Sequence, residues 1–357
     1  MTMIVQEYSD ELEEQYEQLL SNSQVSMFNH SLKYKKFLKT ILKDSEDHYL
    51  CCIENNKIIA ALPLFIKNGP YGQVVNSLPF FGSHGGFVYR DEFTGEHCAF
   101  LFKELDSLIQ RNDTLSCTLI ESPFETNKNF YQLFNGNLSD NRIGQITPLP
   151  KQDIETRPDE QLLSLYHQKT RNMVRKGLKS GFEIAHDGSI QTLQALHSIH
   201  KQNIESIGGQ AKLWSVFESI HEVFDYDTDY RIYTARKDGK IVSALLLFYF
   251  KNTVEYFTPV TLEEYRSEQP LSALIYNAML DAVVEKKMHF WNWGGTWLNQ
   301  TGVYQFKSRW GTRDYPYHYY TRVFLDKHKL SAITPKELLE GYQWFYTVPF
   351  SALGQAV

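Results

Sequence analysis

The sequence predicts an α/β protein made of two tandem domains, each with a mixed β-sheet, that are related by internal duplication. Residues 56–65 read as a turn followed by an apolar strand, and residues 239–248 repeat this pattern at a constant offset of 183 residues. A repeat of that length indicates duplicated domains, because solenoid repeats have periods of only about 20 to 50 residues. The chain length of 357 residues also favours two domains.

The predicted elements follow the same order on both sides of the repeat. Another strand precedes each turn, so each copy starts with a β-hairpin, closed by Asn55-Asn56 or by Asp238-Gly239. Each copy then continues with a strand, a loop, a helix and a final strand. The strand, helix and final strand are predicted at 74–77, 96–111 and 116–121 in the first copy and at 254–260, 270–287 and 289–293 in the second. Each half therefore ends in a β-loop-α-β crossover.

The linker between the copies is predicted from composition. Residues 135–158 carry two glycines and three prolines among polar residues, a mixture that a long helix or a central strand tolerates poorly. We therefore expect a first domain at 1–150, a second at 151–335 and a C-terminal extension at 336–357.

Composition excludes several classes of protein. With 42% hydrophobic and 22% charged residues the chain is an ordinary globular protein, and its net charge of −6 argues against nucleic-acid binding over the whole surface. Neither the N-terminus nor the longest apolar run, 242–250, predicts a signal peptide or a transmembrane segment, so we expect a cytoplasmic protein. The four cysteines lack metal-site spacing, which predicts buried thiols and no metal.

The most unusual charge cluster is the stretch 169–179, which contains five cations and no acid. On a helix Arg171, Arg175 and Lys179 share one face, whereas Val174 and Leu178 lie on an apolar face with residue 182. Like charges in this arrangement repel one another unless an anion lies over them, which favours a phosphate-bearing substrate. A solvated helix face is the alternative.

A second chemically rich segment begins at Trp293-Gly294-Gly295. A strand that ends in two glycines lets the backbone approach a ligand closely, and the crossover topology places this end at the edge where such sheets bind ligands. Phe306-Lys307 follows and sets a cation beside an aromatic ring.

Taken in order, four segments resemble the Fem-type peptidoglycan bridge-forming aminoacyltransferases. They are the basic helix, the loop from Arg266 to Pro270, the strand ending in Gly294-Gly295 and the stretch 302–307. The chain is equally similar to their relatives with a BioF2-like acetyltransferase domain. Both groups belong to the GNAT superfamily, and the resemblance implies two GNAT-like domains in tandem. It covers nearly the whole chain and is strongest from about 165 to 325.

The resemblance also implies roles for individual residues. Phe306-Lys307 matches a pair whose lysine holds substrate or charge near the reacting carbonyl. The basic helix matches a segment in which an arginine meets a substrate phosphate, and Arg171 and Arg175 are both candidates. The loop 261–269 departs from the family because it has no glycine, so a tight backbone cradle for the coenzyme A pyrophosphate is not expected.

Acyl transfer to an amine needs aligned reactants, a deprotonated amine and a stabilised oxyanion. Lys307 suits the last role, with Arg309 as a second cation, although a surface lysine is the alternative. His200, or Glu205 on the same predicted helix 189–207, could accept the amine proton, although a lone histidine on a helix is more often structural.

The loop 78–86 of the first domain is a further candidate site. Gly82, His84 and Gly85 could form a nest of backbone N–H groups for phosphate, next to two phenylalanines that could stack on a sugar ring. The alternative is a tight turn with core aromatics.

These observations predict an N-acyltransferase that moves an acetyl or aminoacyl group from acyl-CoA or aminoacyl-tRNA to an amino group of a cell-envelope, peptidoglycan or sugar precursor. The donor is a co-substrate and no tightly bound cofactor is expected. The predicted partners are a precursor with a phosphate and an amine, and charged tRNA, but not DNA. Two alternatives are a catalytically inactive GNAT-like binding protein and a nucleic-acid-binding module that uses the basic helix alone.

Overall fold

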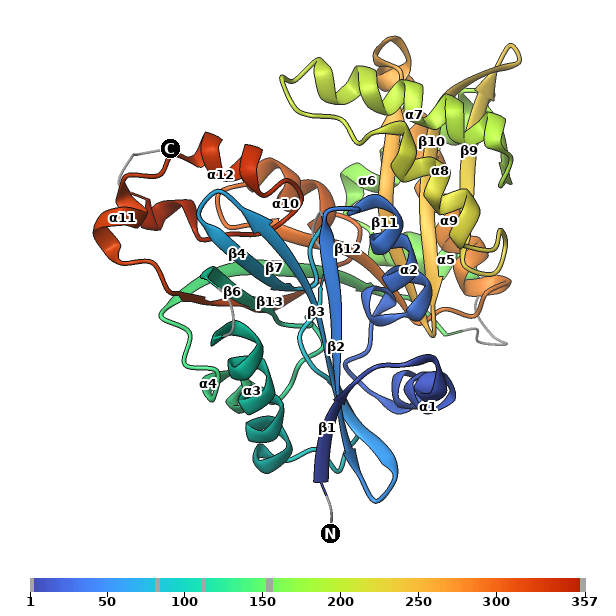
Figure 1. The fold of residues 1–357 in the computed structure, drawn as a ribbon. Coiled ribbons are helices and arrows are strands. Elements are labelled where there is room, and N and C mark those ends of the chain that lie inside the picture. The colour runs from blue at the N-terminus through green and yellow to red at the C-terminus, as the bar shows by residue number, and fades with distance from the viewer. Residues whose placement is uncertain (1–2, 81–83, 111–112, 152–156, 354–357) are drawn as a thin grey trace. The chain divides into compact units, whose positions relative to one another are not determined.

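The structure, a computed structural model, describes residues 3–80, 84–110, 113–151 and 157–353. The chain forms two compact units, drawn in Figure 1. Unit 1 comprises Met1–Arg142 and Pro316–Val357, and unit 2 comprises Ile143–Tyr315.

The sheet of unit 1 has the strand order β1-β2-β3-β4-β6-β13, and β5 pairs with β3 at the side. Neighbours are antiparallel except β4 and β6, which are parallel. The strands are β1 (Met3–Glu7), β2 (Ser45–Glu54), β3 (Lys57–Gly69), β4 (Gly72–Ser77), β5 (Val88–Tyr89), β6 (Thr114–Ile120) and β13 (Arg313–Val323).

Helices cover both faces of this sheet. Helix α3 packs on one face, whereas α1 and α2 lie on the other (Figure 1). The helices of unit 1 are α1 (Glu13–Asn22), α2 (Leu32–Ile41), α3 (Gly95–Gln110), α4 (Asn129–Gln132), α11 (Lys327–Ser331) and α12 (Pro335–Gly341). The apolar stripe of α3, which includes Leu101 and Leu105, is buried against the sheet as the 3.6-residue period requires.

The sheet of unit 2 has the strand order β7-β12-β11-β10-β9-β8. Strands β8 to β11 pair antiparallel, and β11 and β12 pair parallel. The strands are β7 (Leu138–Pro148), β8 (Glu183–Asp187), β9 (Tyr230–Lys237), β10 (Lys240–Phe250), β11 (Thr253–Thr261) and β12 (Phe290–Trp297).

Helix α9 is the central helix of unit 2 because nearly all its sides are apolar and covered by β9 to β11, α5 and α6. Helix α7 packs on β10 and β11 and against α8. The helices of this unit are α5 (Pro158–Leu165), α6 (Gln168–Lys179), α7 (Ile190–Glu205), α8 (Trp214–Val223), α9 (Pro270–Val284) and α10 (Thr301–Ser308).

The predicted duplication is confirmed. Each unit contains an antiparallel hairpin whose two turn residues have positive φ, at Asn55-Asn56 (50° and 61°) and at Asp238-Gly239 (51° and 76°). Such type I′ turns match the right-handed twist of the strands that they join. Each hairpin is followed by an antiparallel strand, a crossover containing a helix and a parallel strand, which is β4-α3-β6 in unit 1 and β11-α9-β12 in unit 2.

The predicted linker contains a strand that the composition concealed. Residues 138–148 form β7, which lies next to β12 in the sheet of unit 2. Its only proline is its last residue, Pro148, where a missing N–H costs little. Gln145 and Thr147 are polar, yet both are buried. The strand tolerates them there because Thr296 Oγ1 donates a hydrogen bond to Gln145 Oε1 and Trp293 Nε1 donates one to Thr147 Oγ1. The prolines therefore mark the end of a strand.

The chain returns to unit 1 after it has completed unit 2. Strand β13 follows all of unit 2 in sequence, yet it pairs with β6 of unit 1, from Tyr319↔Ile120 to Val323↔Ser116. Residues 316–357 thus belong to unit 1, whereas we predicted a second domain to 335 and a separate extension. The hydrogen bonds from Tyr71 N to Tyr342 Oη (2.9 Å) and from Phe80 N to Trp344 O (2.8 Å) hold this C-terminal segment on unit 1.

A chain that ends at Thr312 should lose the fold of unit 1. Without β13 the buried strand β6 becomes an exposed apolar edge, which promotes aggregation. We expect the truncated protein to aggregate at concentrations where the full chain is monodisperse by size-exclusion chromatography. A monodisperse truncated protein with the near-UV circular dichroism of unit 1 intact would contradict the role of β13.

Candidate functional site

The site of unit 2 begins where the pairing of β11 with β12 ends. The two strands pair from Thr253↔Phe290 to Glu255↔Asn292, and both continue beyond the last pair. In an open sheet with crossover connections, the C-terminal ends of parallel strands are where ligands bind.

Strand β12 bends directly after this last pair. Gly294 has φ 75°, a conformation that glycine adopts without strain, and its N–H donates to Asn292 Oδ1 at 2.9 Å. Asn292 is fully buried, and its Nδ2 donates to Glu255 Oε2 at 2.8 Å. Asn292 therefore links the last paired residue of β11 to the glycine bend.

Lys307 holds the other side of the bend. Its Nζ donates to Gly294 O (3.3 Å), Gly295 O (3.1 Å) and Thr296 Oγ1 (3.0 Å), and the residue is buried at the end of α10. Burial disfavours the ammonium form and lowers the pKa of Lys307 to about 8. Lys307 is therefore in direct contact with Gly294 and Gly295, and its side chain is not at the surface.

Glu255 is a site residue that sequence reasoning missed. Its Oε2 accepts from Asn292, whereas its Oε1 is buried with no hydrogen-bond partner among the described residues. Burial raises the pKa of Glu255 to about 8, only partly offset by the Asn292 hydrogen bond. The sequence signal for Glu255 was an acidic residue within an apolar strand. Only the strand register shows that Glu255 belongs to the last residue pair between β11 and β12.

Aromatic rings form the floor under the glycine bend. Trp293 is buried, donates from Nε1 to Thr147 Oγ1 at 2.9 Å and lies 5.6 Å from the ring of Trp310. Phe306 packs edge-on against Trp293 with ring centroids 6.0 Å apart. Trp293, the first residue of the segment that we expected to approach a ligand, is thus a core residue, and Phe306 fixes α10 against that core.

The basic helix α6 packs its small and apolar residues against α9. A Cβ atom at Gly177 would lie 2.4 Å from Gln269 O at the start of α9, so the two helices are in close contact there. Val174 is buried as predicted, but Leu178 is exposed because the buried face runs through Thr170, Val174 and Gly177. Across the described residues, no carboxylate pairs with the exposed cations of α6, which are Lys169, Arg175, Lys176 and Lys179.

Arg171 and Arg175 differ in freedom. Arg171 is half-buried, and its Nη1 donates to Tyr166 O at 2.6 Å, which fixes the turn between α5 and α6. The N–H of His167 in the same turn donates to Arg309 O at 2.9 Å, so the start of α6 lies against the end of α10. Arg175 is exposed and free to contact a ligand. Tyr166 and His167 separate α5 from α6.

The loop before α9 is a short 3₁₀-helix, Glu263–Glu268, closed by Gln269 with φ 64°. Gln269 N and Nε2 both donate hydrogen bonds to Arg266 O. Pro270, which has no N–H, is the first residue of α9. The side chain of Arg266 is exposed. This arrangement is unlike the glycine cradle of a pyrophosphate loop, in line with the sequence.

His200 serves a structural purpose in the described fold. Its Nε2 accepts the N–H of Lys212 at 3.1 Å, and burial, with Lys212 and His197 adding to it, lowers the pKa of His200 to about 4. Glu205 is exposed and pairs with Lys201. The lone pair of Nε2 already accepts the N–H of Lys212, so His200 is a weak candidate for the base that takes a proton from an amine.

In unit 1 the corresponding end of the parallel pair is filled by the chain itself. Gly85 N donates to Ile120 O (3.2 Å) and Gly86 N to Ser77 O (3.3 Å), so the loop bridges the ends of β6 and β4. A Cβ atom at Gly85 would lie 1.6 Å from Ser77 O, which explains the glycine. His84 is buried against Tyr317, with ring centroids 4.8 Å apart. These contacts favour the tight-turn alternative, while Gly82 lies outside the described residues.

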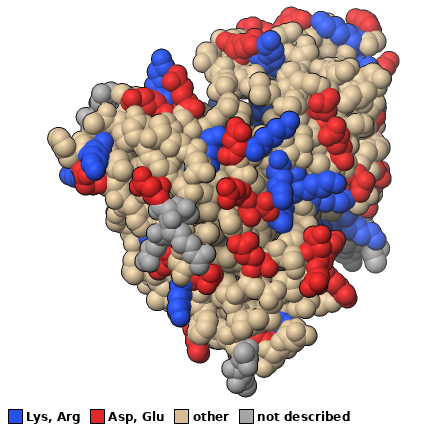
Figure 2. All heavy atoms as spheres, in the orientation of Figure 1, with Lys and Arg blue, Asp and Glu red and all other residues tan. Residues whose placement is uncertain are grey.

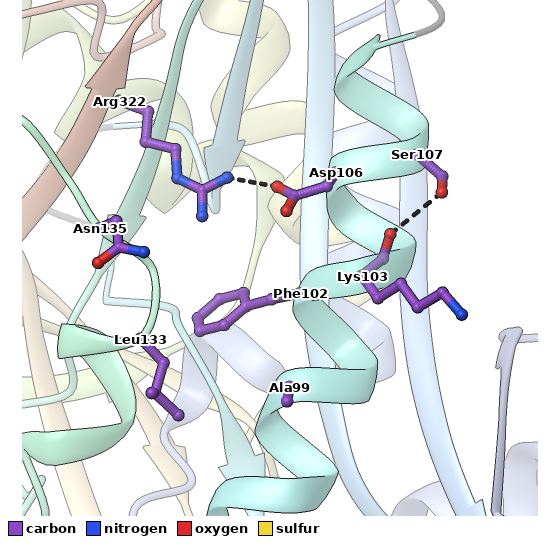
Figure 3. A pocket seen from close by; sticks show the side chains of 8 residues that line it. All are labelled: Ala99, Phe102, Lys103, Asp106, Ser107, Leu133, Asn135 and Arg322. Carbon is purple, nitrogen blue, oxygen red and sulfur yellow. Dashed lines mark hydrogen bonds and ion pairs between the residues drawn. The ribbon is translucent and has the colours of Figure 1, made fainter.

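Two hollows lie on the described surface of unit 1. A hollow of about 440 Å³ between α3 and residues 133–135 is lined by Arg322, whose guanidinium is paired with Asp106 (Figure 3). A second hollow of about 400 Å³ lies along α2, and Figure 2 shows Lys and Arg gathered over this helix. There Lys35 and Lys39 both pair with Asp47.

One group of side chains in unit 2 has the chemistry of metal ligands. Donor atoms of His186, Asp281 and Glu285 lie within 4.8 Å of one another. Arg231 Nη1 donates to Glu285 Oε2 at 2.8 Å and already balances these carboxylates. A divalent cation would have to displace or tolerate this guanidinium, so the group is an ion-pair network rather than a metal centre.

A comparison with protein-family models matches one segment of the chain. Residues 166–321 match the acetyltransferase (GNAT) domain family. The matched segment contains Glu255, the Gly294 bend and Lys307. A search of curated protein sequences gives no significant match. Among the helices of the described ranges, none is long and apolar enough to cross a bilayer.

Solved structures extend the likeness to nearly the whole chain. FemX aligns with 89% of this chain and 97% of its own, at 14% identity and a TM-score of 0.71. A tandem GNAT protein from the clavulanic acid biosynthesis pathway covers 90% and 98%, at 12% identity and 0.57. The C-terminal domain of a putative lysylphosphatidylglycerol synthetase from Agrobacterium fabrum covers 92% and 96%, at 11% identity and 0.57. At such identities the likeness concerns the fold, and it confirms the predicted tandem GNAT architecture.

The substitution Glu255→Gln should change how stability depends on pH. The pKa of Glu255 is raised in the folded state, so ionisation of this group costs stability as pH rises from about 4.5 to about 8. Glutamine keeps an oxygen for Asn292 and has no such cost. We expect the variant to gain stability relative to the wild type with rising pH, by about 1.4 kcal/mol at most for each pH unit between these values. Urea unfolding of both proteins at about pH 5, 7 and 9 measures this difference, and a pH-independent difference would contradict the assignment.

Proposed function

We propose that this chain, a GNAT acyltransferase with two GNAT-like units, transfers an acetyl or aminoacyl group to an amino group of a phosphate-bearing cell-envelope, peptidoglycan or sugar precursor. The donor is acyl-CoA or aminoacyl-tRNA. The observation that carries the proposal is the buried ammonium of Lys307 at the glycine bend, where the pairing of β11 with β12 ends.

Lys307 supplies positive charge where negative charge develops during acyl transfer. When an amine attacks the donor carbonyl, the carbonyl oxygen becomes an oxyanion, and an ammonium in a desolvated site stabilises it more strongly than water does. The three N–H donors of Lys307 already have three acceptors in range, of which Gly294 O is the most distant at 3.3 Å. The smallest rearrangement that brings the ammonium to the substrate is for Lys307 Nζ to leave Gly294 O and donate to the oxyanion instead.

Glu255 replaces His200 as our candidate for the proton acceptor. A general base works best when its pKa is close to the working pH, and burial raises the pKa of Glu255 to about 8. As the N–C bond forms, the proton leaves the attacking amine for the carboxylate. As the thioester or ester bond of the donor breaks, the leaving thiolate or alkoxide takes a proton from that carboxylic acid, which restores the carboxylate. Glu255 Oε1 has no hydrogen-bond partner in the described structure, so no existing hydrogen bond has to break when it accepts the proton, although it is buried until the substrate binds.

Helix α6 is our candidate for binding the acceptor's phosphate. Its exposed cations lack carboxylate partners in the described part of the chain, and its first turn contacts the C-terminal end of α10, which carries Lys307. Arg175 and Lys179 are favoured over Arg171, whose guanidinium is already bonded to Tyr166 O. Arg266 and Arg309 lie near the two ends of α6 and are secondary candidates.

The activity is tested by incubating the purified protein with acetyl-CoA or with aminoacyl-tRNA and a UDP-linked peptidoglycan precursor that carries a free amine. Mass spectrometry should show the acceptor heavier by the acyl group of one donor. Binding of the precursor without acylation by either donor would instead support the inactive, GNAT-like binding protein.

The substitution Lys307→Met should lower kcat by about 100-fold to 1,000-fold with little change in KM, because the lost charge acts mainly on the transition state. Because Lys307 is buried with three acceptors, the substitution should also cost about 1 to 3 kcal/mol in urea unfolding. Lys201→Met, at an exposed lysine paired with Glu205, is the control. Full activity in Lys307→Met would remove Lys307 from the mechanism.

Arg175→Ala should weaken the precursor's binding about tenfold or more, because a charge-assisted contact with phosphate contributes about 1.5 to 3 kcal/mol. Isothermal titration with the precursor, compared with the same precursor lacking its phosphates, measures this loss. Arg171→Ala should reduce stability as well, since it removes the donor to Tyr166 O. Unchanged affinity in Arg175→Ala, Lys179→Ala and Arg171→Ala would mean that α6 is merely a solvated face.

A further inference from the structure

Six of the large apolar side chains that are exposed on unit 2 lie on three segments, while Leu165, Tyr226 and Val284 lie elsewhere on the unit. Trp297 and Leu298 follow the end of β12, and Val303 lies in the first turn of α10. Ile207 and Leu213 lie in the connection between α7 and α8, and Leu178 lies near the end of α6. These six side chains are 43–76% exposed. Exposed apolar groups that gather in one region mark an interaction surface.

The topology brings the first two segments to one edge of the sheet. Strands β11 and β12 are parallel, so their C-terminal ends point the same way. The α7–α8 connection is tied to the C-terminal part of β11. Asn203 exchanges hydrogen bonds with the backbone of Thr261, at 2.9 and 3.1 Å, and Lys212 Nζ donates to Thr258 Oγ1 at 3.3 Å. Ile207 and Leu213 therefore lie at the edge to which Trp297 and Leu298 also belong.

The end of helix α6 reaches the same edge. Ser180 Oγ donates to Glu268 O at 3.2 Å, and Gly177 contacts Gln269 O, both in the loop that leaves the C-terminal end of β11. This contact sets Leu178 beside that loop together with the exposed cations Lys176 and Lys179. Apolar and cationic side chains are thus combined at this edge.

Three carboxylates at this edge are paired with lysines. Glu205 pairs with Lys201, Glu264 with Lys240 and Glu268 with Lys237. Glu263, Asp238 in the turn after β9 and Glu183 at the start of β8 are exposed and have no ion pair in the described ranges. The exposed cations without an ion pair there are Arg175, Lys176, Lys179 and Arg266, so unpaired cations outnumber unpaired carboxylates at this edge.

We propose that this C-terminal edge of unit 2 docks on an anionic lipid bilayer. An anionic bilayer binds apolar and cationic side chains at the same time. Trp and aliphatic side chains enter the boundary between headgroups and acyl chains, while lysines and arginines contact anionic headgroups and contribute about 1 kcal/mol each. A nucleic acid would match the cations and the ring of Trp297, but the aliphatic side chains of Leu298, Ile207 and Leu213 give its bases no stacking surface, whereas all of them can enter a bilayer.

Vesicle flotation with the full-length protein tests this docking and needs no acyl donor or acceptor. The probes are vesicles of phosphatidylcholine alone and vesicles in which part of that lipid is replaced by phosphatidylglycerol. We expect the wild type to float with the anionic vesicles, with less binding as salt is raised. The double substitution Trp297→Ser and Leu298→Ser should lower the partition coefficient about tenfold or more, since two large side chains leave the membrane. The matched control is Leu339→Ser, at an equally exposed leucine of unit 1.

The triple substitution Arg175→Ala, Lys176→Ala and Lys179→Ala separates the two features. It should remove the preference for anionic vesicles and leave the Trp297 and Leu298 contribution unchanged. A wild type that floats with neither vesicle, or a Trp297→Ser, Leu298→Ser protein that floats like the wild type, would overturn the proposal. So would tRNA binding that depends on Trp297 and Leu298 when vesicle binding does not. Because the assay is independent of catalysis, its failure would leave the proposed acyl transfer untouched.

Discussion

A buried ammonium needs oxygen acceptors on every side that water would otherwise occupy, and this requirement organises the second unit. Lys307 obtains its acceptors only because Gly294 turns the carbonyls of β12 toward α10. The turn depends on Asn292, and Asn292 depends on Glu255 in the neighbouring strand. Removing any one of these groups leaves another buried polar atom unpaired, so the residues act as one network.

The two units reach the same topology and use it differently. Both place a parallel strand pair after a hairpin, which leaves backbone groups without partners beyond the last pair. In unit 1 the chain satisfies them itself, through Gly85 and Gly86 at the ends of β6 and β4. In unit 2 the glycines lie within β12, and a side chain, Lys307, meets their carbonyls. The position of the glycines thus distinguishes a closed edge from a candidate active site.

Much of the fold was accessible from sequence because hairpin turns, crossover helices and apolar strands have local signatures, and the constant offset revealed the duplication. The candidate site was accessible in part. Gly294, Gly295 and Lys307 stood out by residue type, but the burial of Lys307 and the pairing of Glu255 with Asn292 depend on strand register, which local patterns do not encode. Strand β7 was missed for a related reason: only its neighbours provide partners for Gln145 and Thr147.

The late arrival of β13 sets the order of events during synthesis. Strand β6 is complete at Ile120, but its partner begins at Arg313, about 190 residues later. At about 5 to 20 residues per second, a ribosome needs roughly 10 to 40 s to make that segment. The half of the protein that emerges first therefore finishes last, after the whole second unit has been released from the exit tunnel. During this interval its incomplete sheet is a natural client for chaperones, and the duration is set by translation rather than by folding.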